Sequence, residues 1–76
     1  MKNENVETNQ YTEDEINRFI IICIEQYASF KDISGKETYR LMSEKKVIDE
    51  LKNDYEDLHG MSWEWLNDYI DSLLNK

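Results

Sequence analysis

The sequence has 76 residues, enough for one small domain, and it carries 17 acidic side chains against 9 basic ones, a formal net charge of −8. Proteins bind nucleic acid and anionic membranes mainly through Lys and Arg, so this balance argues against direct binding of either. The same balance suits a protein partner with a basic surface.

The N-terminal part of the chain changes from a polar segment to a strongly periodic one. Residues 1–11 are polar and lack periodicity, which predicts a disordered tail. Thr12 followed by Glu15 has the pattern of a capping box, which predicts the start of a helix. Apolar residues then recur at steps of three and four: Ile16, Phe19, Ile20, Cys23, Ile24, Tyr27 and Phe30. Because Ile21 and Ile22 widen this stripe, we expect this helix at the centre of the core.

The segment at residues 33–38 reads ISGKET, and its Gly-Lys pair is also found in phosphate-binding loops. That motif needs an earlier Gly, which is absent, and a Ser or Thr where Glu37 stands, so we reject nucleotide binding. Ser34 and Glu37 instead form a second capping box. The segment therefore predicts the start of a helix over about residues 35–45. Its buried face is expected to hold Leu41 and Met42, helped by Thr38 or Tyr39.

Two further helices are predicted in the last third of the chain. The third runs from about Val47 to His59, and Gly60 is expected to close it in the left-handed conformation. Its apolar face holds Val47 or Ile48, Leu51, Tyr55 and Leu58. Ser62 caps the fourth helix, whose stripe contains Trp63, Leu66, Ile70, Leu73 and Leu74. Trp65 and Tyr69 lie beside that stripe and widen it.

These elements predict an all-α fold, a compact bundle of about four short helices after the disordered N-terminal tail. We expect the helices to form a single domain over residues 12–76, because no long linker divides them. The single cysteine fits a reducing compartment, no apolar run could span a bilayer, and the N-terminus lacks an apolar leader. The chain is therefore expected to be cytoplasmic.

Few residues are candidates for catalysis or metal binding. Cys23 lies in the middle of an apolar stripe, which favours a buried packing residue over a nucleophile. His59, beside Gly60, suits a helix end whose carbonyls it can cap, with contact to a partner as the alternative. One Cys and one His do not make a typical structural zinc site, and the acidic segment DYEDLHG lacks the order of a calcium loop. We expect no catalytic residue, no metal and no cofactor.

Acidic and aromatic side chains crowd the last third of the chain. The acidic ones are Asp49, Glu50, Asp54, Glu56, Asp57, Glu64, Asp68 and Asp71, opposed there by Lys52. They are either solvated helix faces or a surface for a basic partner. Trp63 and Trp65 are two residues apart on one helix, so one of them is expected at the rim, covering the core or anchoring a partner. The predicted partner-binding residues are Asp54, Glu56, Asp57, His59, Trp65 and Tyr69.

Four segments in sequence order, FIIICIEQYA, ISGKETYRLM, VIDELKNDYEDLH and WLNDYIDSLL, together resemble a family of small bacterial proteins of unknown function, DUF3791. The resemblance covers about residues 16–74. Matching positions are Phe19, Cys23, Ile24, Glu25, Tyr27, Ser34, Gly35, Lys36, Glu37, Tyr39, Leu41, Tyr55, Leu58, His59, Asp68 and Ile70. Met42 stands where the family pattern has Phe, and the chain between His59 and Trp65 also departs from it. The resemblance implies no catalytic residues.

The resemblance also implies that the chain is the companion of a larger bacterial protein. Some of the larger proteins paired with this family resemble ADP-ribosyltransferase-type toxins. We therefore expect a non-enzymatic protein-binding module, the antitoxin-like or inhibitory partner of a larger protein with a basic surface. One alternative is an acidic mimic of nucleic acid that inhibits a DNA-binding or defence protein. Another is a structural subunit that pairs with itself as a homodimer through exposed aromatic side chains.

Overall fold

The computed structural model describes residues 11–76; residues 1–10, which hold nearly all of the predicted tail, lie outside the described residues. Five α-helices follow one another: α2 (Glu13–Lys31), α3 (Gly35–Glu44), α4 (Val47–Asn53), α5 (Tyr55–Leu58) and α6 (Trp63–Leu74). Residues 11–76 contain no strand, so the predicted all-α fold is confirmed.

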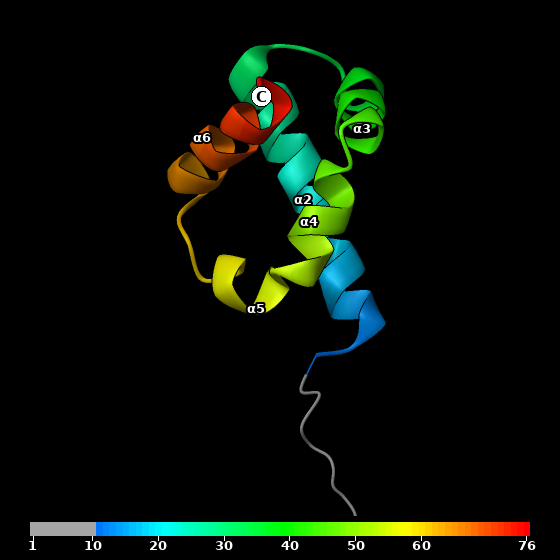
Figure 1. The fold of residues 1–76 in the computed structure, drawn as a ribbon, viewed down its shortest axis with the longest axis vertical. Helices are drawn as coiled ribbons and strands as arrows, with labels where there is room; N and C mark the ends of the chain where they lie inside the picture. Colours follow the sequence, from blue (N-terminus) through cyan, green and yellow to red (C-terminus); the bar gives the residue numbers. More distant parts are fainter. Residues whose placement is uncertain (1–10) are drawn as a thin grey trace, which may run out of the picture.

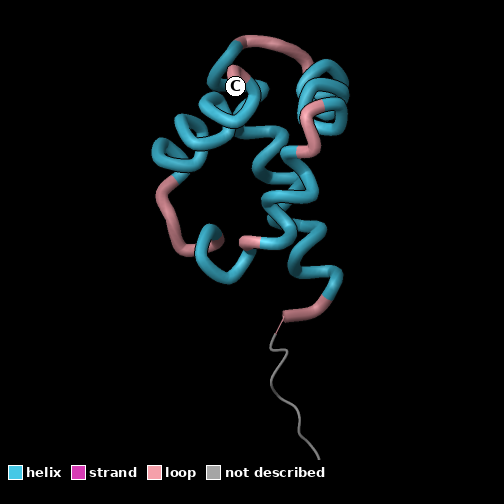
Figure 2. The backbone as a smooth tube through the Cα atoms, in the orientation of Figure 1, coloured by secondary structure: helices cyan, strands magenta, loops and turns pink. Residues whose placement is uncertain are grey.

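The longest helix, α2, runs through the whole height of the bundle and organises it (Figure 1). It contacts α3, α4 and α6, and α3 and α6 lie on opposite sides of its upper half. From α3 the chain descends through α4 to the short helix α5, and a loop then leads up to α6 (Figure 2). The central position expected for the first helix is therefore confirmed.

The core lies where the apolar stripe of α2 meets the other helices. The stripe buries Phe19, Ile20, Cys23 and Tyr27 against Met42, Val47, Leu51, Leu58, Leu66, Ile70 and Leu73. On α3 the buried neighbour of Met42 is Thr38, while Tyr39 points to solvent. Two residues predicted in the core are exposed, and Ile16 and Leu41 are only half-buried and lie outside the core cluster. Phe30 is 50% exposed in the last turn of α2, where its ring lies tilted against Tyr27 and Lys31 Nζ lies 5.8 Å from its centroid. Trp63 is 38% exposed in the first turn of α6.

The capping predictions hold in part. Thr12 and Glu15 form the complete capping box, with both backbone N–H groups donating to the other residue's side chain at 3.0–3.1 Å. Ser34 accepts a hydrogen bond from the N–H of Glu37 at 3.0 Å. The other hydrogen bond of this capping box, from the Ser34 backbone N–H to the Glu37 carboxylate, was predicted wrongly, because that carboxylate accepts from Arg40 instead. Ser62 caps α6 as expected.

The third predicted helix is interrupted. At Asp54 the backbone leaves helical geometry, with φ −104° and ψ 18°, so that α4 ends and α5 begins in a new direction. Asn53 and Asp54 are both weak helix formers, which makes this the place where bending costs least. The expectation for Gly60 is also wrong, since no glycine in the described residues has positive φ. The left-handed residues are Asp32, which ends α2, and Lys46, which precedes α4.

Candidate functional site

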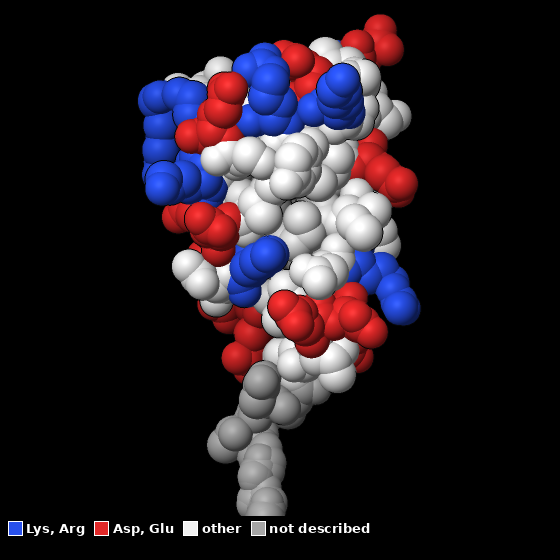
Figure 3. Space-filling view, turned by 90° about the vertical axis from the view of Figure 1, so that its right-hand side faces the viewer, with Lys and Arg blue, Asp and Glu red and all other residues white. Residues whose placement is uncertain are grey.

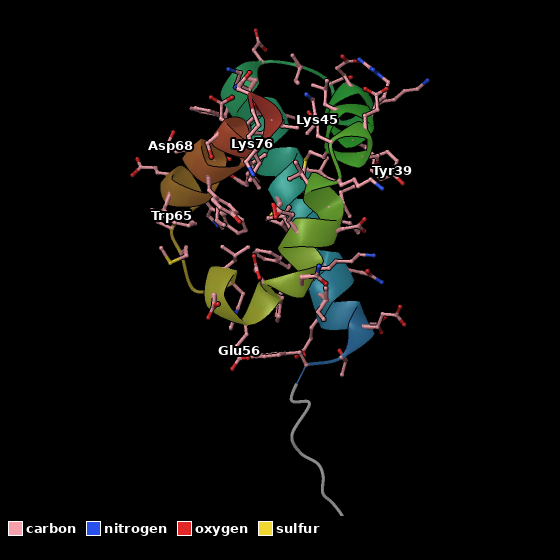
Figure 4. The ribbon with its side chains drawn as sticks, in the orientation of Figure 1. Tyr39, Lys45, Glu56, Trp65, Asp68 and Lys76 are labelled. Atoms are coloured by element: carbon pink, nitrogen blue, oxygen red, sulfur yellow. The ribbon has the colours of Figure 1, made fainter. Side chains whose placement is uncertain are left out.

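The six predicted partner-binding residues fall into two neighbouring groups. Asp54 follows α4 and lies near Tyr69 of α6, which also carries Trp65. Glu56 and Asp57 lie on α5, and His59 ends it. Five of the six side chains are exposed, and Tyr69 is half-buried. Figure 4 shows Glu56 at the lower tip of the bundle and Trp65 on α6, with the connecting loop between them.

The first group is built around a stacked pair of rings. Trp65 and Tyr69 are four residues apart on α6, which places them on one face of the helix, and their rings stack with centroids 5.2 Å apart and planes 18° apart. Trp65 remains 42% exposed although Tyr69 supports it. Its backbone N–H donates to Ser62 Oγ at 3.1 Å, so the helix cap fixes the turn that carries the indole.

Two carboxylates accompany this pair. Burial raises the pKa of the Tyr69 hydroxyl, and the negative charges of Glu50 and Asp54 raise it further. Both carboxylates therefore lie close enough to the Tyr69 ring to affect its ionisation. We call the surface formed by Glu50, Asp54, Trp65 and Tyr69 the acidic-aromatic face.

His59 is held by the end of α5. Its Nδ1 lies 3.0 Å from the carbonyl oxygen of Tyr55 and 3.1 Å from that of Glu56, and its ring stacks on Tyr55 with centroids 4.7 Å apart. Carbonyl oxygens only accept, so Nδ1 donates the proton and Nε2 is left to meet solvent or a partner. The capping role predicted for His59 is confirmed, and its contact with a partner stays a prediction.

A pocket that the sequence did not predict lies beside His59. Phe19 and Ile22 of α2, Tyr55 of α5 and Trp63 of α6 form its apolar walls, Glu15, Arg18 and His59 complete its lining, and its volume is about 240 Å³. The ring of Phe19 meets Tyr55 edge-on at 5.2 Å and stacks with Trp63 at 6.3 Å. We call this the aromatic pocket.

Tyr11, the first described residue, also lies against this region. Its ring meets Tyr55 edge-on with centroids 4.8 Å apart and meets His59 at 5.2 Å. The predicted tail included Tyr11, and this residue instead packs on the rings of Tyr55 and His59. The partial exposure of Trp63 has its explanation here, because its indole forms a wall of the pocket rather than part of the core.

Cys23, weighed above as a possible nucleophile, lies in the core. Cys23 is fully buried, and burial raises the pKa of its thiol to about 12, so the thiol stays protonated at neutral pH. Its predicted packing role is confirmed. Within residues 11–76, no three side chains of the His, Cys, Asp or Glu type converge as metal ligands would. Helices long and apolar enough to cross a bilayer are absent from the same part of the chain.

Comparison with known proteins gives one match. No curated protein and no solved structure is significantly similar to the chain. The profile of the family described as "Protein of unknown function (DUF3791)" matches residues 18–76. This range includes most of α2, all the later helices, and every predicted partner-binding residue. The predicted resemblance is confirmed, and the chain belongs to the DUF3791 family of proteins of unknown function.

Proposed function

We propose that this chain is a non-enzymatic protein-binding module that docks on a basic surface of a larger bacterial protein and acts as its antitoxin-like or inhibitory partner. The observation that carries the proposal is the exposed Trp65, which stacks on Tyr69, a residue whose hydroxyl is in turn affected by the charges of Glu50 and Asp54. An exposed indole supported by a second ring has the character of a binding hot spot.

The stacked pair favours tight binding for an entropic reason. A long side chain that becomes immobile on binding costs about 0.5–1.5 kcal/mol of conformational entropy. Trp65 already rests on Tyr69, and its turn is fixed by the Ser62 cap, so little of that cost remains. The exposed part of the indole is then free to contribute its apolar area to the complex.

The acidic side chains supply steering. Asp54, Glu56 and Asp57 are exposed within four residues of one another, and the whole chain has a net charge of −8. Complementary charge accelerates encounter with a basic partner, and this acceleration weakens as salt screens the field. Carboxylates therefore act mainly on the association rate, and the aromatic contacts act mainly on dissociation.

The aromatic pocket adds a place for an anchor from the partner. Its volume of about 240 Å³ suits one apolar or aromatic side chain rather than a larger ligand. Glu15 and Arg18 lie in its lining with opposite charges, and His59, whose Nδ1 is occupied by backbone carbonyls, is a third polar residue there. An inserted side chain would meet Phe19 and Trp63 and leave these polar groups to bond its backbone.

The experiment separates the two contributions by measuring association and dissociation rates with the isolated partner. Replacing Asp54→Asn, Glu56→Gln and Asp57→Asn together should slow association by about tenfold at low salt and flatten its salt dependence. Trp65→Ala should instead raise the dissociation rate, by about 30-fold for a hot spot worth about 2 kcal/mol.

Matched controls remove the same groups elsewhere. Glu25→Gln, Asp32→Asn and Glu44→Gln remove three exposed charges from α2, its end and α3, and Phe30→Ala removes an exposed ring from α2. Both controls should bind like the parent chain. Equal losses in controls and test variants would refute docking through α5 and α6. Competition by duplex DNA for the same partner would indicate that the acidic face mimics nucleic acid.

A further inference from the structure

A second apolar surface lies away from the proposed docking face. The most exposed large apolar side chains described in the chain are Tyr39 at 57% and Ile21 at 55%, and both line one groove between α2, α3 and α4. Ile20, Ile24 and Ile48 complete its apolar lining, Asn17 and Lys52 are its polar residues, and its volume is about 420 Å³. Figure 4 shows Tyr39 directed outward from α3. We call this the α2–α3–α4 groove.

We propose that a second copy of this chain covers the α2–α3–α4 groove, forming an antiparallel homodimer whose twofold axis passes near Ile21. An interface of this kind places the same surface of both copies in contact. Ile21 and Tyr39 of each copy then leave water together. The contact is independent of the proposed function, since it uses none of Asp54, Trp65 or Tyr69.

Charge selects a second copy as the occupant. In Figure 3, which faces this side of the bundle, uncharged surface lies in the middle, basic side chains with acidic ones among them lie along the upper edge, and acidic side chains predominate toward the lower edge. The basic residues of α3 and the turn after it are exposed, namely Lys36, Arg40, Lys45 and Lys46, and two acidic residues of α3, Glu37 and Glu44, lie among them. At the other end, Glu13 and Asp14 are exposed in the first turn of α2.

Helical spacing places these acidic groups on the groove side of α2. Asp14, Asn17, Ile21 and Ile24 follow one another at steps of three, four and three, so they share one face of the helix. Asp14 is seven residues from Ile21, or about 10 Å along the axis. A twofold rotation at Ile21 therefore brings the acidic start of one α2 toward the basic edge of the other copy.

Other kinds of partner fit this surface less well. A partner of one charge sign would match one end of the groove and repel the other, whereas a rotated copy matches both ends. Arg40 is already paired with Glu37 and Glu44, so Lys36, Lys45 and Lys46 are the cations that remain for the contact. The size is also suitable. A standard interface covers about 800 Å² on each partner, about a sixth of the 5085 Å² that this chain exposes.

The first test is the mass of the protein in solution, measured by analytical ultracentrifugation across a concentration series. The parent chain should dimerise. Ile21→Lys should raise the dimer dissociation constant by more than about 100-fold, because two ammonium groups would meet at the axis. Tyr39→Lys is a second variant from a different helix, and Phe30→Lys is the matched control with similar exposure outside the groove. Circular dichroism confirms that each variant is folded.

The second test exchanges the charges. One variant carries Glu13→Lys and Asp14→Lys, and the other carries Lys36→Glu and Lys45→Glu. Each alone should be monomeric, because like charges then meet at both ends of the interface. An equimolar mixture should form a heterodimer, since each contact regains opposite charges. A monomeric parent chain, a dimer that survives Ile21→Lys, or a mixture that stays monomeric would each overturn the proposal.

Discussion

One side-chain hydrogen bond ties α6, which carries Trp65 and Tyr69 of the acidic-aromatic face, to the central helix. Tyr27 Oη donates to Asp71 Oδ1 at 2.6 Å, and Lys31 Nζ lies 3.4 Å from the same oxygen. Tyr27 is buried, while the Asp71 side chain is one-third exposed, at 33%. The hydrogen bond from Tyr27, followed by the charge of Lys31, holds the pKa of Asp71 below its usual value.

We expect Tyr27→Phe to destabilise the fold by about 1.5 kcal/mol. The substitution keeps the buried ring and removes one hydrogen bond to a charged acceptor, which is typically worth about 1.5–3 kcal/mol. The lower end applies because Asp71 is partly exposed, so water and Lys31 replace some of the lost interaction. In a domain of this size, the loss should lower Tm by about 6–12 °C. Thermal and urea unfolding followed by circular dichroism would measure both quantities.

The cost should depend on pH in a defined direction. The pKa of Asp71 is lowered in the folded state, so its contribution is present above the usual aspartate value, about 4, and is lost as pH falls through the folded pKa. Burial, followed by the bond to Asp71, raises the pKa of Tyr27, so that contribution is present below the usual tyrosine value, about 10, and is lost as pH rises. Equal stability of the two proteins at neutral pH, or a cost undiminished in acid, would refute this reasoning.

Three further predictions concern single side chains. Cys23 should react with thiol reagents only as fast as the protein unfolds globally, and faster labelling would contradict its burial. Cys23→Ser should lower the free energy of unfolding by about 1–3 kcal/mol, because it buries a hydroxyl. Ser62→Ala should cost about 1 kcal/mol in urea unfolding and weaken partner binding, whereas unchanged binding would mean that the cap does not position Trp65. Trp65→Ala should change the free energy of unfolding by less than about 1 kcal/mol, and a larger loss would show that the indole serves the core.

The helices and most of the core could be predicted because their signals are local. The capping box at Thr12 and the stripe from Phe19 to Tyr27 depend on spacing within one helix, and the structure has both. The bend at Asp54 could not be predicted in this way. Leu51, Tyr55 and Leu58 keep helical spacing across it, so periodicity continues where the backbone does not.

The candidate site was only partly accessible from sequence. The stacking of Trp65 on Tyr69 follows from a four-residue step along one helix. The aromatic pocket joins Phe19 to Trp63, which come from opposite ends of the chain, and no local pattern relates them. The arrangement of charge on the surface could not be predicted for a similar reason. Between Glu13 and Lys46 the opposite signs nearly cancel in the sequence, yet the fold separates the acidic start of α2 from the basic residues of α3.

The most direct test of the proposed function is a comparative pull-down from the source organism, using the tagged parent chain, Trp65→Ala and the control Phe30→Ala side by side. We expect one stoichiometric protein that the parent and the control retain at low salt, that high salt releases, and that Trp65→Ala fails to hold. Equal recovery of that protein by all three chains, or recovery unaffected by salt, would contradict docking through the acidic-aromatic face.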